Sequence, residues 1–206
     1  MRVIALRLVT TLVLLASAVQ ILAAPLDDLA ARLQGLKGLS GTFQQTLLSE
    51  TGEPLEQSRG DFNMLRPGFL SWHITDPDEQ LLVASGESLW HYDVELETAT
   101  RRSIPAGNPT SPLTILGGDI DLLGNYYTVT QTAENRWTLV PTFDNAEFES
   151  VELTFDARWP STMSIRDRVG RSTRIELQSV IENPTLSAAD FDFRPPDGVD
   201  IYDNGP

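Results

Sequence analysis

From residue 39 onward, the sequence consists of short segments in which apolar and polar residues alternate. In the first segment, the residues of one parity are Leu39, Gly41, Phe43, Gln45 and Leu47. A period of two places successive side chains on opposite faces of a β-strand, so each segment predicts a strand. Further strands are expected at residues 62–64, 70–74, 79–84, 88–92, 126–130, 136–140, 148–155, 162–166 and 173–179. Many short strands at this spacing predict an antiparallel sheet that curls into a barrel or a sandwich.

Two helices are expected outside this pattern. The first is predicted by leucines that recur every three or four residues, namely Leu26, Leu29, Leu33 and Leu36. The second follows Pro112, because proline is favoured at the first position of a helix, and it carries Leu113, Ile115 and Leu116. Each helix can be a permanent part of the core or a movable lid, and the sequence leaves both alternatives open.

The first 24 residues have the composition of a secretory signal peptide. Arg2 and Arg7 supply positive charge, residues 8–15 are almost entirely apolar, and small residues follow. A membrane-spanning helix is the alternative, although polar residues interrupt the apolar run. The cleavage position stays open between residues 18 and 24. We therefore expect a signal peptide at 1–24 and a single exported domain at 25–206.

The composition excludes several classes of protein. The chain has no cysteine, which excludes disulfides, thiol catalysis, thiolate zinc sites and a lipid-modified N-terminal cysteine. The formal net charge is −14, and a chain this acidic is repelled by nucleic acids and by anionic lipid headgroups. We expect a protein without a nucleic-acid partner that is stabilised by its core alone.

Motifs of the common enzyme classes are missing from the sequence. His73 and His91 are its two histidines, both on predicted strands, and two histidines make a poor metal site. Neither a G-x-S-x-G nor an H-E-x-x-H motif occurs, and there is no phosphate-binding loop. Acid pairs such as Asp27-Asp28 are typical of a solvated surface. We expect a protein that is not an enzyme and that needs no metal or cofactor; a hydrolase is the alternative that the many carboxylates leave open.

Several short motifs follow one another in a specific order. They are Phe43-Gln44-Gln45, Arg66-Pro67 followed by Trp72, Pro77-Asp78-Glu79, Leu82-Val83, Leu89-Trp90, Ser111-Pro112-Leu113 and Phe191-Asp192-Phe193-Arg194-Pro195-Pro196. In this order and at these intervals, they resemble the outer-membrane lipoprotein carrier family of the Lol pathway in Gram-negative bacteria. The resemblance extends over essentially the whole chain after residue 24. Ala84-Ser85 departs from it, because the family usually has a Ser-Asp pair there.

The resemblance implies a mainly β fold, a half-open antiparallel β-barrel with a helical lid. It also implies a monomeric carrier in the periplasm. Such a carrier accepts lipoproteins from an inner-membrane ABC exporter, shields their acyl chains in an apolar cavity and delivers them to an outer-membrane receptor. The alternative is a periplasmic lipid or stress sensor of the same fold that regulates a signalling partner. Such sensors usually need an additional domain, and the sequence ends shortly after Val199, so we favour the carrier.

Three sets of residues are expected to form the lipid site. The resemblance implies that Arg66 hydrogen-bonds to the lid helix and holds the empty cavity closed; the alternative is a surface arginine in a turn. The expected lid residues are Leu113, Ile115 and Leu116. The cavity is expected among inward apolar side chains of the strands, and for each of them ordinary core packing is the alternative. These side chains are Phe43, Leu47, Phe62, Met64, Leu70, Trp72, Leu81, Val83, Trp90 and Trp137.

Overall fold

A computed structural model of the chain describes residues 25–86, 88–104, 112–117, 119–144, 146–156 and 158–204. The predicted signal peptide at 1–24 lies outside the described residues. In the described part of the chain, no helix is both long and apolar enough to cross a membrane.

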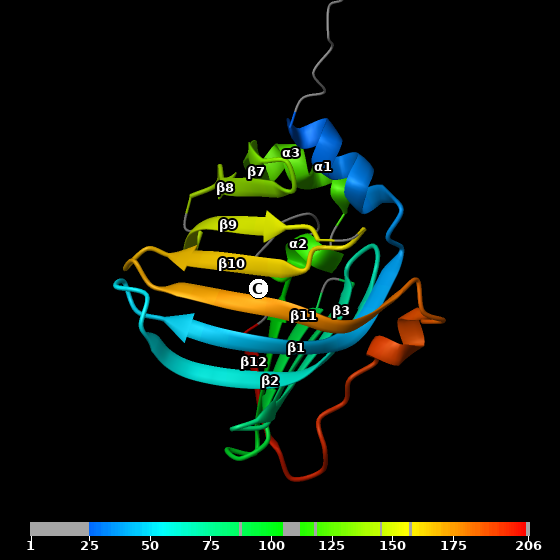
Figure 1. Cartoon of the computed structure of the whole chain (residues 1–206). Helices are drawn as coiled ribbons and strands as arrows, with labels where there is room; N and C mark the ends of the chain where they lie inside the picture. The colour runs from blue at the N-terminus through cyan, green and yellow to red at the C-terminus, as the bar shows by residue number, and fades with distance from the viewer. Residues whose placement is uncertain are drawn as a thin grey trace, which may run out of the picture.

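The strands form one open sheet. They are β1 (Gly38–Leu48), β2 (Pro54–Leu65), β3 (Phe69–Asp76), β4 (Gln80–Ser85), β5 (Ser88–Asp93), β6 (Thr98–Ser103), β7 (Tyr127–Ala133), β8 (Arg136–Pro141), β9 (Phe148–Thr154), β10 (Thr162–Asp167), β11 (Ser172–Glu182) and β12 (Asp200–Asn204). Their order in the sheet is β12-β6-β5-β4-β3-β2-β1-β11-β10-β9-β8-β7. All neighbours are antiparallel except β12 and β6, which are parallel. Because β12 and β7 remain separate edges, the curled sheet is a half-open barrel, as predicted (Figure 1).

Short helices accompany the sheet. They are α1 (Pro25–Gln34), α2 (Thr114–Gly117), η1 (Ile120–Leu122), α3 (Leu123–Tyr126) and η2 (Ala188–Phe191). The helix predicted from the first leucines is confirmed as α1, which buries Leu29 and Leu33 and packs against β7 and η1. The second predicted helix is α2, a single turn that the sheet curves around in Figure 1 and that contacts β2 and β3.

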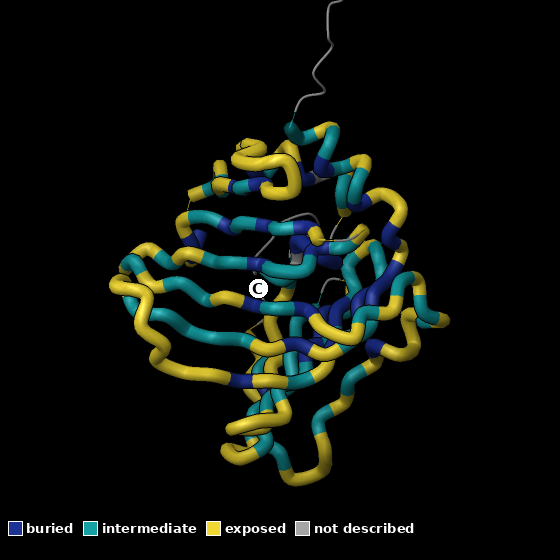
Figure 2. Tube along the Cα trace, in the orientation of Figure 1, coloured by how far each residue is buried: buried dark blue, intermediate teal, exposed yellow. Residues whose placement is uncertain are grey.

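Cross-strand register shows which side chains share a face of the sheet. Ile175 of β11 lies opposite Met163 of β10, which lies opposite Leu153 of β9, which in turn lies opposite Trp137 of β8. Each of these four side chains is at most 1% exposed. They form one core with residues of α1 and α2, and Figure 2 shows the buried positions along these strands. We call the face that carries them the inner face.

The opposite face of β3 and β4 is covered by the C-terminal segment. The short helix η2 packs against both strands, and Phe191 at its end is 2% exposed, with its ring centroid 5.5 Å from that of Phe69. After η2 the chain continues to β12, which adds to the edge of the sheet beside β6. We call the face under this segment the outer face.

Candidate functional site

An aromatic cluster occupies the inner face of β1, β2 and β3. Phe43 lies opposite Gly60, and Phe62 lies opposite Trp72. The rings of Phe43 and Trp72 are stacked with centroids 3.8 Å apart, and the ring of Phe62 is 5.7 Å from that of Trp72. An added Cβ atom at Gly60 would collide with the backbone of His73 in β3, so only glycine fits opposite Phe43. The inner face here is apolar and densely packed.

Seven of the ten expected cavity residues share this inner face. Cross-strand register and burial place them in or beside the core that also contains the helices, and they are Phe43, Leu47, Phe62, Met64, Leu70, Trp72 and Trp137. All except Leu47 are buried. Leu47 is half-buried near the end of β1, where the sheet gives way to the β1–β2 hairpin loop.

The other three expected cavity residues, Leu81, Val83 and Trp90, lie on the outer face, so their inward placement was wrong. Trp72 lies opposite Leu82 of β4, and the neighbouring Val83 therefore points to the other face, opposite Trp90. Phe193 of the C-terminal segment covers this position, with its ring centroid 5.8 Å from that of Trp90. The error arose because β4 has apolar residues at both parities, so alternation alone could not identify its inner side.

Helix α2 places two of the three expected lid residues in the core. Ile115 is 2% exposed and Leu116 is 1% exposed, whereas Leu113 precedes the helix and is half-buried against the core. The helix therefore occupies part of the space that the curled sheet encloses. An acyl chain on the inner face under α2 would have to displace these two side chains.

The turn between β2 and β3 holds the C-terminal end of α2. The amide of Gly68 donates a hydrogen bond to the carbonyl oxygen of Gly117, the last residue of α2, over 2.8 Å. The backbone amide of Arg66 donates to the carbonyl oxygen of Lys37 over 2.8 Å, which attaches the same turn to the start of β1. Sequence reasoning missed this backbone connection, although the Arg66-Pro67-Gly68 turn signal marked its position.

The guanidinium group of Arg66 is largely withdrawn from solvent. Burial lowers the pKa of Arg66 to about 10, against the opposing effect of the nearby Asp119 carboxylate. Asp119 follows α2 in the chain and caps η1 by accepting a hydrogen bond from the amide of Asp121 over 3.0 Å. Arg66 is thus not a freely solvated surface residue, and its guanidinium lies near the segment that follows the predicted lid helix.

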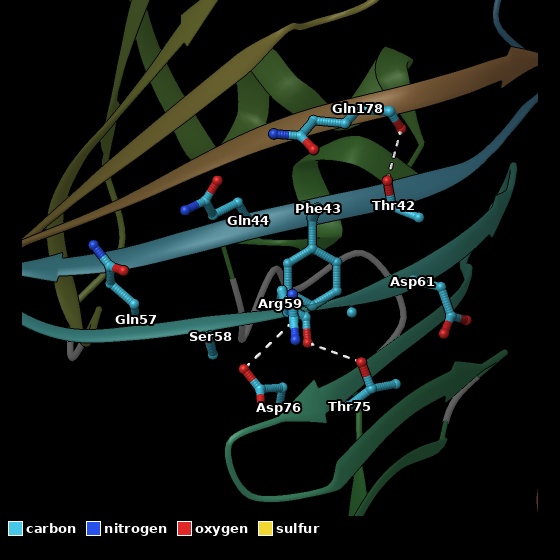
Figure 3. Close-up of a pocket in the computed structure, with 11 residues that line it drawn as sticks. Thr42, Phe43, Gln44, Gln57, Ser58, Arg59, Asp61, Thr75, Asp76 and Gln178 are labelled. Atoms are coloured by element: carbon cyan, nitrogen blue, oxygen red, sulfur yellow. Dashed lines mark hydrogen bonds and ion pairs between the residues drawn. The ribbon is translucent and has the colours of Figure 1, made fainter.

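A separate polar groove of about 580 Å³ is lined by β1, β2, β3 and β11. Figure 3 shows amide, hydroxyl and charged side chains around it, with an ion pair of 3.4 Å between Arg59 Nε and Asp76 Oδ2. Phe43 is the one apolar side chain among its described lining residues. This lining favours water or a polar ligand over acyl chains, and the groove meets the apolar inner face at Phe43.

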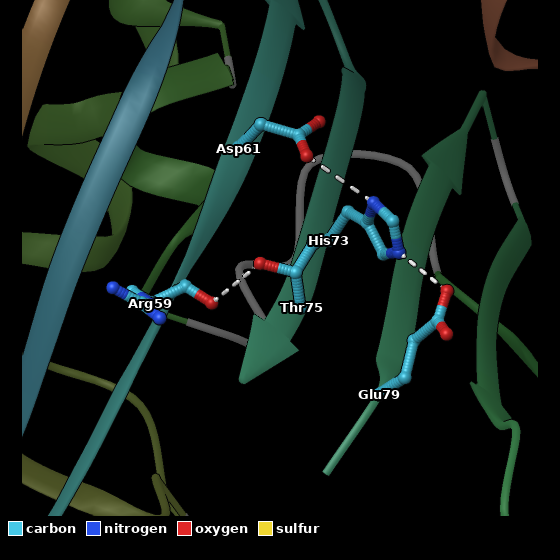
Figure 4. Close-up of polar contacts among 5 residues, drawn as sticks. All are labelled: Arg59, Asp61, His73, Thr75 and Glu79. Carbon is cyan, nitrogen blue, oxygen red and sulfur yellow. Dashed lines mark hydrogen bonds and ion pairs between the residues drawn. The ribbon is translucent and has the colours of Figure 1, made fainter. Parts of the chain in front are cut away.

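One histidine lies between two carboxylates (Figure 4). His73 Nδ1 is 3.2 Å from Asp61 Oδ2, and His73 Nε2 is 2.9 Å from Glu79 Oε1. Both ring nitrogens can donate hydrogen bonds only when the imidazole is protonated. The other histidine, His91, contacts Gln80 instead, over 3.1 Å. Within the described ranges, no group of three or more histidine, aspartate or glutamate residues is placed to hold a metal ion.

The sequence is similar to one family model and to several proteins that share its description. Residues 34–194 match the family model described as Outer membrane lipoprotein carrier protein LolA. An outer-membrane lipoprotein carrier protein from Halorhodospira halophila is 34% identical over 199 residues, which cover 97% of this chain and 94% of that protein. One from Pseudomonas aeruginosa is 33% identical over 204 residues, covering 95% of this chain and 98% of that protein.

Among solved structures, a LolA superfamily protein from Nitrosomonas europaea has a similar fold. The TM-score is 0.51 at 9% sequence identity, and the match covers 83% of this chain and 99% of the other. At this identity, the likeness shows the fold alone.

Proposed function

Because the chain belongs to the outer-membrane lipoprotein carrier family, we propose that it is a non-catalytic carrier that shields the acyl chains of lipoproteins in the periplasm. It accepts its cargo from an inner-membrane ABC exporter and gives it up to an outer-membrane receptor. The observation that carries this proposal is the apolar inner face, which is continuous from β1 to β3 and across to β8 and is occupied by α1 and α2.

The physical task of such a carrier is to keep acyl chains out of water. Exposing one methylene group to water costs about 0.8 kcal/mol, so an anchor with several acyl chains would cost tens of kcal/mol. The carrier must outcompete water but not a membrane, because it has to lose its cargo at the end. An inner face that helices already fill meets this condition, since part of the gain from binding lipid is offset by displacing α2.

The movable element in this proposal is α2. Its anchoring contacts described above include the backbone hydrogen bond to Gly68 and the side chains of Ile115 and Leu116 in the core. A helix of four residues has little stability of its own, so its position depends on these contacts. Arg66 beside Asp119 adds a charged group at the same end, and we assign to it the role of stabilising the closed position.

The proposal is tested by release of cargo from membranes. The purified protein is incubated with inner-membrane vesicles that contain the exporter, ATP and a labelled outer-membrane lipoprotein, and the soluble fraction is then separated. We expect the lipoprotein in a soluble one-to-one complex with this protein. If the label stays in the membrane while the Pseudomonas aeruginosa relative releases it, the carrier function is wrong for this chain.

A matched pair of variants links this result to the inner face. Leu47→Asn places a polar side chain on the half-buried part of the inner face, and we expect it to reduce the yield of soluble complex. Leu96→Asn makes the same change at a residue that is 70% exposed in the turn between β5 and β6, and it should release cargo like the wild type. If both variants gave the same yield of soluble complex, the inner face would not be the site that binds the cargo.

A further inference from the structure

The hydroxyl group of Tyr127 is buried in the core without a hydrogen-bond partner among the described residues. The residue is 3% exposed and lies at the start of β7. Buried hydroxyl groups in native proteins are nearly always hydrogen-bonded, because a buried unpaired donor loses its bonds to water without replacement. Burial also raises the pKa of Tyr127, so the phenol keeps its proton and can act as a donor.

Tyr127 lies on the inner face, at the first residue of the edge strand β7. Val129, two residues further along β7, lies opposite Leu139 of β8, which lies opposite Val151 of β9. The row continues through Ile165 of β10 and Thr173 of β11 to Leu47 of β1. Within this row, Leu139 and Val151 are fully buried, and Val129, Ile165 and Leu47 are half-buried.

The surroundings of the hydroxyl group restrict the ligand that it can take. The ring of Tyr127 is stacked with that of Phe148, with centroids 6.4 Å apart, and it meets the ring of Phe143 edge-on at 6.3 Å. An anionic group is disfavoured in such an apolar site, because the loss of hydration would not be compensated by one neutral donor. A neutral carbonyl oxygen at the end of a hydrocarbon chain satisfies the donor and fits the aromatic surroundings.

We propose that the Tyr127 hydroxyl donates a hydrogen bond to the carbonyl oxygen of an acyl group in the lipid anchor of the cargo. This inference rests on the proposed carrier function and adds a specificity-determining residue to it. An acyl linkage lies at the polar end of its chain, and Tyr127 lies at the end of β7, where the adjacent Phe143 is half-buried. The chain itself would extend from there along the buried rows.

Trp137 also has a buried donor without a partner among the described residues, its indole Nε1. The guanidinium carbon of Arg32, a residue of α1, lies 4.7 Å from the centroid of the Trp137 ring. Replacing an indole with a side chain that lacks the N–H group removes volume from the core. Tyr127 is the better candidate, because its phenolic oxygen can be removed by substitution with phenylalanine while the ring is kept.

Two probes that differ in one carbonyl group test the proposal. 1-Palmitoylglycerol has an ester carbonyl, and 1-O-hexadecylglycerol has an ether in its place. We expect the wild-type protein to bind the ester about three- to tenfold more tightly, which is the contribution of one neutral hydrogen bond. We expect Tyr127→Phe to bind the two probes equally, and Tyr126→Phe, a change at the neighbouring half-buried tyrosine, to keep the preference.

A second measurement separates a ligand-binding hydroxyl from a structural one. Removal of an unpaired buried donor should leave the urea midpoint of Tyr127→Phe equal to or higher than that of the wild type. A lower midpoint together with an unchanged ester preference would assign the hydroxyl to the fold and overturn the proposal. Equal binding of both probes by the wild type would overturn it too, while leaving the carrier function intact. If the wild type bound neither probe, the proposed lipid binding itself would fail.

Discussion

The amide N–H of Gly68 donates a hydrogen bond to the carbonyl oxygen of Gly117 over 2.8 Å. Gly68 has a φ of +85°, a conformation that glycine adopts without strain. At Gly117, an added Cβ atom would lie 3.0 Å from the carbonyl oxygen of Phe69 and 3.3 Å from Met64 Cγ. The helix therefore joins the turn at a point where an added side chain would force its neighbours to shift.

Substitution of Gly117 should loosen α2. Gly117→Ala forces its new methyl group against the Phe69 carbonyl, which belongs to the backbone and cannot turn aside. We expect the free energy of unfolding to fall by about 1 kcal/mol and a fluorescent fatty acid to enter faster in stopped-flow measurements. Gly35→Ala is the control, because its Cβ would have only an ordinary 3.6 Å contact with Arg158. Slower or unchanged entry for Gly117→Ala would mean that α2 does not limit uptake.

Arg66 should influence cargo release more than stability. Arg66→Leu removes a charged group whose burial is unfavourable, as its lowered pKa of about 10 shows. The nearby carboxylate of Asp119 is exposed, so the substitution does not leave it as a buried charge without compensation. We expect a folded protein whose transfer of bound lipoprotein to the receptor falls on the order of tenfold, about 1.4 kcal/mol, because the closed position of α2 is weakened. Arg102→Leu, at an exposed site on β6, should transfer normally. If Arg66→Leu transferred its cargo normally, Arg66 would not stabilise the closed position of α2.

The outer-face aromatic cluster should serve stability and not lipid binding. Phe193 packs against Trp90 and Tyr92, with ring centroids 5.8 Å from each. We expect Phe193→Ala to lower the free energy of unfolding by about 1–2 kcal/mol, less than for a fully buried phenylalanine, while fatty-acid affinity stays at the wild-type value. Urea denaturation and a fluorescence titration on the same samples measure both quantities. A clear loss of affinity would show that the outer face contributes to the lipid site.

Asp190 should make the C-terminal segment sensitive to acid. The amide and the hydroxyl of Ser187 donate to its carboxylate over 2.7 and 2.9 Å, and these bonds lower the pKa of Asp190 from the usual 3.8. A lowered carboxyl pKa stabilises the fold above the unfolded-state value, and the contribution is lost as the pH falls through the lower, folded-state value. We expect the Ser187 amide resonance to titrate with a midpoint below 3.8, and to lose this titration in Asp190→Asn. A midpoint at or above the usual value would contradict the capping geometry.

Strands β6 and β12 were not predicted by alternation. β6 spans Thr98–Ser103 and contains two arginines. All five residues of β12 are exposed. Neither segment has an apolar face that a periodic pattern could reveal. They are strands because the neighbouring β5 and then β6 offer backbone hydrogen-bond partners, and such partners exist only once the sheet has formed.

By itself, the sequence determined the periodicity of most strands and the helix of residues 25–34, because alternation and leucine spacing are local properties of the chain. The half-open barrel was implied by the resemblance to the carrier family, since alternation alone allowed a barrel or a sandwich. The sequence also located the turn at Arg66-Pro67-Gly68 and most inner-face residues of β1, β2 and β3. Only the tertiary structure decided that Val83 and Trp90 face the C-terminal segment, that Gly68 holds α2, and that the Tyr127 hydroxyl is buried without a described partner. These features depend on contacts between segments that are distant in the sequence. A local residue pattern does not show which segment will pack against a given face of a strand.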